Sequence, residues 1–175
     1  MPIKLAAMDL DDTLLDPNLT LSERSIKAVR AASLAGIIMT FATNRSFLAS
    51  KPFLEPLGIS GLLITYGGAQ TRDAETGLVV HELLIDRTIV AEVLAFAAGH
   101  GLYAHVQRDD DVLYPKSCIW PDKYAAYVKY AGRECPELPD SPIDASKLMI
   151  LGEPEAITRL EVALSQEPRE QPNKK

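Results

Sequence analysis

A short apolar segment that ends in a cluster of acidic residues constrains the fold of this chain more than any other feature. Residues 3–8 are apolar apart from Lys4, and Asp9, Asp11 and Asp12 follow within four positions. A continuous apolar run predicts a strand buried on both faces of a parallel sheet. Unpaired charge is costly to bury, so this cluster needs a chemical reason. Ligands of open parallel sheets bind beyond the carboxyl ends of the strands, where the cluster is predicted to lie.

Apolar strands and helices alternate through the first 65 residues. Thr20 and Glu23 fit a capping box, which predicts the start of a helix, and Gly36 is suited to end it. The alternation predicts a right-handed parallel α/β unit. The expected strands cover residues 3–8, 37–42 and 61–65, and a second, shorter helix covers residues 46–56.

The regular alternation of strands and helices stops after residue 66, and hairpins and single helices follow. This order of elements predicts an α+β module. We therefore expect a core over residues 1–82, a second unit over residues 83–166 and a loose polar tail over residues 167–175. The expected strands are 70–72, 79–81, 102–107, 112–114 and 147–151, and the expected helices are 88–100, 123–131 and 154–165.

Composition excludes several classes of partner. The 175 residues carry a formal net charge of −6, which disfavours nucleic acid or an anionic membrane as the main partner. Cys118 and Cys135 are not spaced as a metal or redox pair, so we expect two reduced thiols. The sequence shows no signal peptide and no apolar run of membrane-spanning length. We expect a soluble, cytoplasmic protein.

The acidic cluster suggests phosphoryl chemistry. In extended chain, Asp9 and Asp11 face the same way, about 7 Å apart. Two such carboxylates are suited to share a Mg²⁺ ion, which takes one or two carboxylates together with water and phosphate oxygens. A carboxylate is also a competent nucleophile toward phosphorus, and a second one can act as general acid and base.

The second predicted strand ends in Thr43, Asn44 and Arg45, at the entrance of a helix. A hydroxyl, helix N-terminal N–H groups and a guanidinium together suit a phosphate. Each element alone has an ordinary explanation: a D-x-D pair is usually a solvated turn, and Thr-Asn-Arg is usually a helix cap. Their placement at adjacent strand ends favours the functional interpretation.

These residues resemble a known family. The stretches MDLDDTLLD, GIIMTFATNR and LLITYGGAQTRD are similar to the haloacid dehalogenase (HAD) superfamily, and most similar to its Cof-type (class IIB) sugar-phosphate phosphatases. The resemblance implies a partial Rossmann-like α/β core, with a parallel sheet and helices on both faces, and an α+β cap domain. It also implies a Mg²⁺-dependent phosphomonoester hydrolase that forms an aspartyl-phosphate and acts on a small phosphorylated metabolite, such as a sugar phosphate.

The resemblance assigns roles to individual residues. Asp9 would be the nucleophile and Asp11 the general acid and base, and both would hold Mg²⁺, Asp11 through its main-chain carbonyl as well. Thr13 would support the loop. Thr43, Asn44 and Arg45 would bind the phosphoryl group or the substrate.

The chain also departs from the family pattern. Asp12 and Asn44 stand where Gly is usual, and Gly67 stands where Asn is usual. The catalytic Lys and the acidic G-D-x-x-N-D loop that follow the cap in this branch are absent, so we expect a chain truncated before the C-terminal part of the core. Its first strand would then have an open apolar edge and could self-associate.

Other charged and aromatic residues have ordinary explanations. We expect Lys147 to be a solvated strand-edge residue, and residues 109–111 to form a solvated hairpin tip. Helical spacing favours packing for three tyrosines, Tyr124, Tyr127 and Tyr130. The alternative function is a catalytically inactive HAD-like protein that acts as a binding module. A phosphoacceptor signalling domain is set aside, because its phosphorylated Asp would stand where residues 64–66 read Ile-Thr-Tyr.

Overall fold

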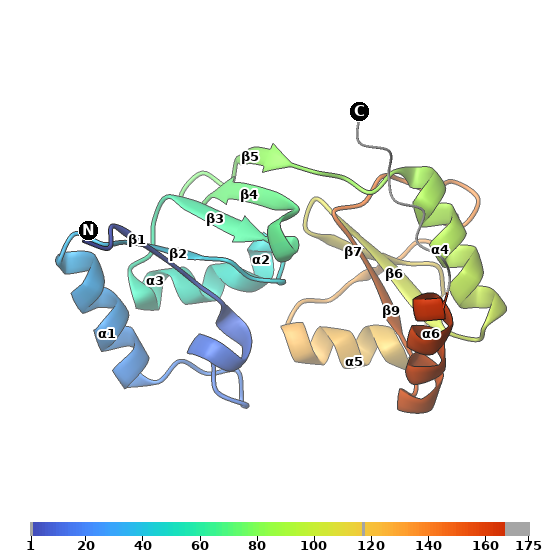
Figure 1. Ribbon diagram of the computed structural model, residues 1–175. Coiled ribbons are helices and arrows are strands. Elements are labelled where there is room, and N and C mark those ends of the chain that lie inside the picture. Colours follow the sequence, from blue (N-terminus) through green and yellow to red (C-terminus); the bar gives the residue numbers. More distant parts are fainter. Residues whose placement is uncertain (1, 117, 167–175) are drawn as a thin grey trace.

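The computed structural model describes residues 2–116 and 118–166, and the predicted tail at 167–175 lies outside them. The chain forms two lobes that lie side by side and are joined by the segment between β5 and α4 (Figure 1). We call residues 2–82 the core lobe and residues 87–166 the cap lobe. Within the described ranges, no helix combines the length and apolarity that crossing a bilayer requires.

The core lobe contains the predicted parallel unit. Strands β1 and β2 pair in parallel, with Leu5 opposite Ile38 and Met8 opposite Phe41. The next strand, β3, continues the parallel arrangement through a bridge between Ala42 and Ile64, and it pairs antiparallel with β4, which pairs with β5. These strands are β1 (Leu5–Met8), β2 (Ile38–Phe41), β3 (Leu62–Thr65), β4 (Gln70–Asp73) and β5 (Val79–Glu82).

Short helices connect the core strands. They are α1 (Glu23–Leu34), α2 (Phe47–Ser50) and α3 (Leu54–Leu57), and α2 and α3 are separated by a 3₁₀ turn at Lys51–Phe53. Arg30 of α1 donates to the main-chain oxygen of Pro56 at 2.8 Å, which holds α1 against α3. Leu10, Phe41 and Leu63 are completely buried, so the core packs beneath the ends of the three parallel strands.

The cap lobe is a mixed sheet with helices. Its strand order is β8-β7-β6-β9, in which β6 is antiparallel to both β7 and β9. Val90 of α4 and Val106 of β6 are fully buried in a second apolar cluster, separate from that of the core lobe. The elements are α4 (Arg87–Gly99), β6 (Tyr103–Arg108), β7 (Asp111–Tyr114), α5 (Ile119–Val128), β8 (Arg133–Glu134), β9 (Lys147–Leu151) and α6 (Pro154–Gln166).

The structure corrects several predicted boundaries. The cap of α1 is Ser22, whose hydroxyl accepts from the Ser25 N–H at 3.0 Å. Thr20 instead donates its hydroxyl to Asp16, because that carboxylate organises the preceding loop. The predicted helix 46–56 is divided at Pro52, which has no N–H to continue the ladder. The short strand β8 was not predicted.

Candidate active site

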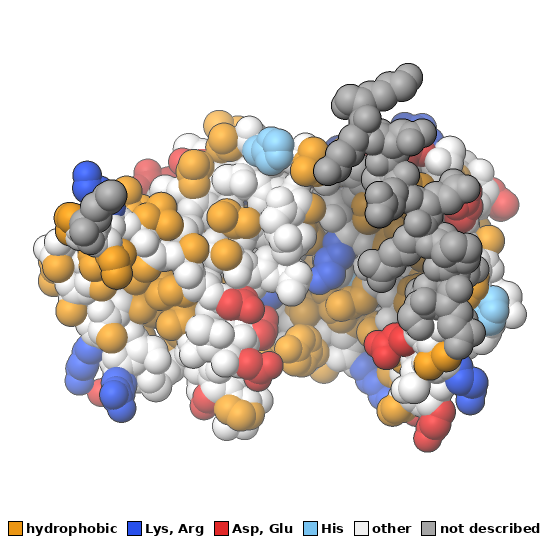
Figure 2. Space-filling view, viewed as in Figure 1, with side chains coloured by type: hydrophobic (Ala, Val, Ile, Leu, Met, Phe, Trp, Pro, Cys, Tyr) orange, Lys and Arg blue, Asp and Glu red, His pale blue; other side chains and the backbone are white. Residues whose placement is uncertain are grey.

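The carboxyl ends of β1, β2 and β3 meet at one edge of the core lobe. Main-chain hydrogen bonds join the loops there: Thr43 N to Ile64 O at 3.0 Å, Tyr66 N to Arg45 O at 3.0 Å, and Gly67 N to Thr43 O at 2.9 Å. Acidic side chains gather on the core lobe beside the hollow between the two lobes (Figure 2). The Ala42 N–H donates to Met8 O at 2.9 Å, so the loops after β1 and β2, which carry the predicted site residues, also lie next to each other.

Asp11 and Arg45 form a bidentate ion pair. Arg45 Nε donates to Asp11 Oδ2 at 2.8 Å, and Nη2 donates to Oδ1 at 2.7 Å. The Arg45 side chain is 5% exposed and that of Asp11 25% exposed. Hydrogen bonding from Arg45 is the largest influence on the Asp11 carboxyl and holds its pKa below the usual value, while Asp11 raises the pKa of Arg45. Asp11 is thus held as a carboxylate in this state.

Asp9 lies just beyond the end of β1, in a different environment. Its side chain is exposed, and its Oδ1 accepts from the Leu10 N–H at 2.7 Å. Leu10–Leu14 then form a helical turn closed by Leu15 N to Leu10 O at 2.8 Å. Both carboxylates follow β1 in a loop, in which Asp9 (φ −78°, ψ 159°) and Asp11 (φ −70°, ψ 137°) keep extended backbone angles.

The remaining predicted residues differ in exposure. Thr43 is 2% exposed, and its hydroxyl accepts from the Arg45 N–H at 3.3 Å, so it supports the loop from below. Thr13 and Asn44 are exposed. Asp12 is also exposed and has φ 55°, the left-handed conformation that explains why a glycine commonly serves at such a position.

Asn44 and Gly67, two departures from the family pattern, are sterically matched. A Cβ atom added to Gly67 would lie 2.6 Å from Asn44 Oδ1, and Gly67 has φ 66°. The positive φ of Gly67 disfavours a side chain at this position, and the exposed Asn44 side chain would also have to move aside for one. The two departures act together as one local arrangement.

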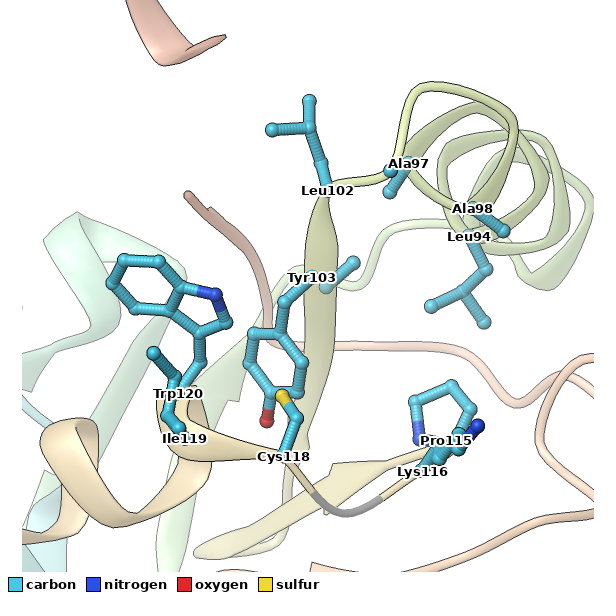
Figure 3. A pocket seen from close by; sticks show the side chains of 12 residues that line it. Leu94, Ala97, Ala98, Leu102, Tyr103, Pro115, Lys116, Cys118, Ile119 and Trp120 are labelled. Carbon is cyan, nitrogen blue, oxygen red and sulfur yellow. The ribbon is translucent and has the colours of Figure 1, made fainter. Parts of the chain in front are cut away.

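A pocket of about 380 Å³ opens beside these loops and is lined from both lobes. The core lobe contributes Asp11, Asn44, Arg45, Ser46 and Ala49, and the cap lobe contributes side chains from α5, β7 and β9. A larger cavity of about 560 Å³ lies entirely in the cap lobe, between Leu94, Leu102, Cys118 and Trp120 (Figure 3). It contains none of the predicted site residues, so the smaller pocket is the candidate active site.

Lys147 is a site residue that the sequence analysis missed. Its Nζ donates to the main-chain oxygen of Asn44 at 3.0 Å, and it lines the pocket together with Asp11. Burial lowers the pKa of Lys147, and the nearby Asp11 opposes this shift. The expectation of a solvated lysine was wrong, because pairing of Lys147 with the buried Gln107 turns it toward the site. Only that cross-strand register reveals this placement.

The tyrosines of α5 also reach the pocket. Tyr124 and Tyr127 of α5 line it together with Tyr130, which lies two residues beyond the end of α5, although packing was the favoured explanation for all three. Packing does hold Tyr124, whose ring lies 4.5 Å from that of the buried His105 and whose hydroxyl accepts from Gln107 Nε2 at 2.8 Å. Tyr127 interacts with the Asp11 carboxylate and lies 6.0 Å from the Arg45 guanidinium.

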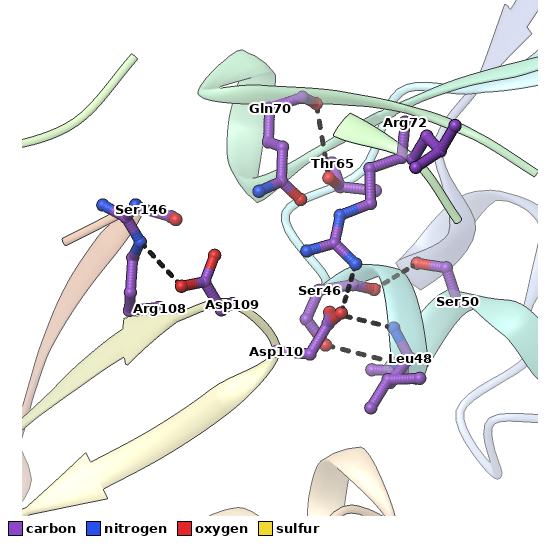
Figure 4. Close-up of polar contacts among 12 residues, drawn as sticks. Ser46, Leu48, Ser50, Thr65, Gln70, Arg72, Arg108, Asp109, Asp110 and Ser146 are labelled. Carbon is purple, nitrogen blue, oxygen red and sulfur yellow. Dashed lines mark hydrogen bonds and ion pairs between the residues drawn. The ribbon is translucent and has the colours of Figure 1, made fainter. Parts of the chain in front are cut away.

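Asp110 joins the two lobes. It pairs with Arg72 of β4, and its Oδ1 accepts from the Leu48 N–H at 3.3 Å (Figure 4). Asp110 and Arg72 are each only 8% exposed. The expectation of a solvated acidic tip over residues 109–111 was therefore wrong at its central position. This contact holds the cap lobe against the core lobe beside the pocket.

The acidic loop after β1 offers few side-chain ligands for a metal ion. Across the described residues, no three His, Cys, Asp or Glu side chains come together as a metal site. Mg²⁺ nevertheless commonly takes only one or two carboxylates and completes its shell with water and phosphate oxygens. The exposed Asp9 carboxylate suits that role, whereas both oxygens of Asp11 are engaged by Arg45. The loop therefore suits an ion whose ligands are mostly water and phosphate oxygens, and it does not supply a complete set of protein ligands.

Comparisons with known proteins identify the family. The family model of haloacid dehalogenase-like hydrolases matches residues 6–173, and the chain belongs to this family, in its Cof-type branch. It is 35% identical over 82 residues to a 5-amino-6-(5-phospho-D-ribitylamino)uracil phosphatase of Bacillus subtilis, covering 47% of this chain and 33% of that protein. It is 34% identical over 107 residues to an HMP-PP phosphatase of Yersinia pestis, covering 61% of this chain and 39% of that protein.

The solved structures agree on the fold. A haloacid dehalogenase-like hydrolase from Bacillus subtilis superposes with a TM-score of 0.76 at 25% identity, covering 94% of this chain and 66% of that one. The α/β core with an α+β cap is the architecture that the sequence predicted. The chain spans 33% and 39% of the lengths of these two phosphatases.

Proposed function

We propose that this chain carries the reaction centre of a phosphomonoester hydrolase that acts on a small phosphorylated metabolite. The observation that carries the proposal is the Asp11–Arg45 pair in the pocket of about 380 Å³ between the lobes. The exposed carboxylate of Asp9 stands two positions before Asp11 in the same loop, although Asp9 is not among the residues that line the pocket. The relatives are named as phosphatases, which supports the reaction class. We assign the core to residues 1–82 and the cap to residues 83–166. The family resemblance favours a sugar phosphate as substrate.

In the proposed reaction, an Asp9 oxygen attacks phosphorus while the bond to the ester oxygen breaks, which gives an aspartyl-phosphate. Asp11 donates a proton to the departing alkoxide and later accepts one from the water that hydrolyses the intermediate. Arg45 and Lys147 supply positive charge for the phosphoryl oxygens, since both line the pocket. Thr43, Asn44 and Thr13 position the loops around that group.

The Asp11–Arg45 pair accounts for how Asp11 acquires its proton. Arg45 lowers the pKa of Asp11, so the carboxyl is ionised when the pair is intact. A substrate phosphate competes for the guanidinium, because Arg binds phosphate in the same bidentate manner as carboxylate. Release of Arg45 raises the pKa of Asp11 and allows it to carry the proton that the leaving group requires.

Mg²⁺ is the metal ion we propose for this site. The Asp9 carboxylate and the main-chain carbonyl of Asp11 would hold it. When bound, the ion neutralises charge on the phosphoryl oxygens. The family generally uses a metal ion, which supports the assignment.

The second candidate function is an inactive binding module. Two observations favour it: no cluster of three metal-ligating side chains exists in the described part of the chain, and Asp11 is fully engaged by Arg45. Such a module would bind phosphate esters in the same pocket without hydrolysing them.

Hydrolysis of p-nitrophenyl phosphate with and without Mg²⁺ separates the two functions. The hydrolase predicts Mg²⁺-dependent turnover that Asp9→Asn abolishes, because an amide cannot attack phosphorus. Asp12→Asn is the matched control, since Asp12 is exposed in the same loop and Asn tolerates its left-handed backbone. Turnover by Asp9→Asn at the parental rate would disprove the assignment, and absence of turnover in the parent would favour the binding module.

We also propose that the free edge of β1 mediates self-association. In the described part of the chain β1 pairs only with β2, and Leu5 is 55% exposed. Light scattering after size exclusion should show a dimer or larger species, and Leu5→Lys should shift it to monomer. Leu34→Lys on α1, where Leu34 is 90% exposed, is the matched control. A stable monomer of the parent protein at all concentrations would contradict the proposal.

A cytoplasmic location completes the proposal. Both cysteines are free, with Cys118 exposed and Cys135 buried, as suits a reducing compartment. The net charge of −6 supports a small-molecule partner in preference to nucleic acid or an anionic membrane.

A further inference from the structure

We propose that the cavity of about 560 Å³ inside the cap lobe binds a small carboxylic acid, as its carboxylate, that carries an apolar tail. Among the described residues, none lines both this cavity and the candidate active site, so the inference goes beyond the proposed hydrolase function. Three features of the cap cavity carry it: an apolar wall, a buried hydroxyl group without a partner, and positive charge along one side.

The wall of the cap cavity is apolar. It comes from the C-terminal half of α4, the start of β6 and the segment that leads into α5 (Figure 3). Leu94 and Ala97 of α4 are buried. Leu102, Ile119 and Trp120 leave part of their surface uncovered. Covering this surface with the hydrocarbon part of a ligand is favourable, and the volume lies within the roughly 300–1,000 Å³ typical of small-molecule sites.

The hydroxyl group of Tyr103 is buried at this cavity without a hydrogen-bond partner. Tyr103 lines the cavity and is 8% exposed, and its Oη has no partner in the part of the chain that the structure describes. Burial raises the pKa of Tyr103, so the phenol keeps its proton and can donate it in a hydrogen bond. A buried donor without an acceptor is destabilising, and a ligand that brings an acceptor removes this cost.

Access to this hydroxyl group depends on Cys118. The Tyr103 ring points its hydroxyl group toward the Cys118 side chain, which is exposed (Figure 3). Rotation of this small side chain about one bond brings the hydroxyl group into contact with a ligand in the cavity. The ligand atom that replaces the thiol beside Tyr103 has to be a hydrogen-bond acceptor.

Positive charge lies along the segment that leads into α5. Lys116 lines the cavity, and so do Ile119 and Trp120 at the start of the helix. Helix N-terminal N–H groups carry partial positive charge, and the Cys118 side chain makes no capping hydrogen bond to them. No Asp or Glu stands among the described lining residues, because Asp122 of the first turn is exposed and lies outside the lining. An anionic acceptor is therefore favoured over a cationic or neutral group.

The three features fit one kind of ligand. Its carboxylate accepts from Tyr103 Oη and lies beside Lys116 and the start of α5, where it is charge-matched. Its tail packs against Leu94, Leu102 and Trp120. A medium-chain carboxylic acid such as octanoate has both parts.

The fluorescence of Trp120 tests the inference directly, because this residue is the one tryptophan of the chain and lines the cavity. Titration of the full chain with octanoate, followed by fluorescence and by calorimetry, should show saturable binding with a Kd below about 1 mM. Octylamine has the same tail and the opposite charge, and it should bind at least about tenfold more weakly. Equal or tighter binding of octylamine, or no saturable binding of octanoate, would overturn the inference.

Tyr103→Phe keeps the ring and removes only the hydroxyl group. It should weaken octanoate binding about fivefold to tenfold, without lowering the midpoint of urea unfolding, since this hydroxyl group has no partner within the described residues. Tyr114→Phe is the matched control, because the Tyr114 ring lies 6.4 Å from that of Tyr103 and does not line the cavity. Equal octanoate affinity of Tyr103→Phe and the parent would place the carboxylate elsewhere and overturn the inference.

Lys116→Gln tests the charge at the cavity. It should lower the preference for octanoate over octylamine about threefold, because an exposed lysine contributes modestly. Lys129→Gln is the matched control, since Lys129 is exposed at the C-terminal end of α5 and lines neither cavity. A preference that Lys116→Gln leaves unchanged would contradict the proposed position of the carboxylate.

Discussion

The charge state and the available space of individual residues in this site depend on their neighbours. Asp11 illustrates this, because its carboxylate would be an ordinary loop residue without the buried Arg45, which binds both of its oxygens. Asn44 and Gly67 illustrate it sterically, since the side chain of one occupies the space that a side chain on the other would need. Sequence analysis identified both departures from the family pattern but could not show that they compensate for each other.

We predict that Gly67→Ala destabilises the protein by about 1–3 kcal/mol, because it adds a Cβ atom at φ 66°, 2.6 Å from Asn44 Oδ1. Adding Asn44→Gly should recover the steric part of that loss and leave the cost of the left-handed backbone. Urea unfolding of the two single variants and the double variant measures the coupling. Additive effects of the two changes would show that the contact does not constrain position 67.

Secondary-structure elements were predicted well where periodicity is strong. The parallel strands, the hairpin and the helix α4 appear where the apolar pattern placed them. The expectation that the first strand is buried on both faces was wrong, because Leu5 is 55% exposed and Ala6 and Met8 are only partly buried.

Other incorrect predictions concerned where helices begin and toward which face of a sheet the strand side chains point. Ser22, and not Thr20, caps α1, because the Thr20 hydroxyl is hydrogen-bonded to Asp16. Lys147 points toward the site because β9 pairs with β6 in a register that the sequence of one strand does not specify.

Strand β6 should make the stability of the protein dependent on pH. His105 is completely buried, and burial lowers its pKa from 6.5 to about 4. The unfolded chain therefore takes up a proton below pH 6.5 that the folded chain takes up only near pH 4, so stability falls as pH falls through this window. The full loss is about 3 kcal/mol.

Urea unfolding between pH 7 and pH 4 checks this prediction. His105→Gln should flatten the pH dependence over that range, although it also changes the packing against Tyr124. His81→Gln, at an exposed position of β5, is the matched control and should keep the parental curve. A His105→Gln curve parallel to that of the parent would assign the pH dependence to other groups.

The whole molecule is two apolar clusters held together beside the pocket by polar contacts. The Arg72–Asp110 pair and the Lys147–Asn44 hydrogen bond both cross from core to cap. The pocket exists only because the lobes are in contact, since its lining comes from both. Strand pairing within a lobe already joins residues as distant as Tyr103 and Leu151, and contacts between the lobes, such as that of Lys147 with Asn44 103 positions away, close the candidate site.

We predict that Asp110→Asn destabilises the protein by about 3–5 kcal/mol, because it leaves the buried Arg72 guanidinium without a charged partner. The amide oxygen can still accept from Leu48 N, so the variant removes charge with little change of shape. Asp109→Asn is the matched control, since Asp109 is exposed at the adjacent position. Thermal or urea unfolding measures both, and equal stability of the two variants would show that the pair does not hold the lobes together.

The family, the parallel core and the residues at the ends of its first two strands could be predicted from the amino-acid sequence alone. This was possible because sheet strands and phosphate-binding loops impose local patterns of apolar and polar residues. The pairing of Arg45 with Asp11, the position of Lys147 and the tyrosines of α5 at the site, and the burial of Asp110 follow from the three-dimensional fold. These are contacts between segments distant in the chain, and they depend on strand register and lobe packing, which local patterns do not encode.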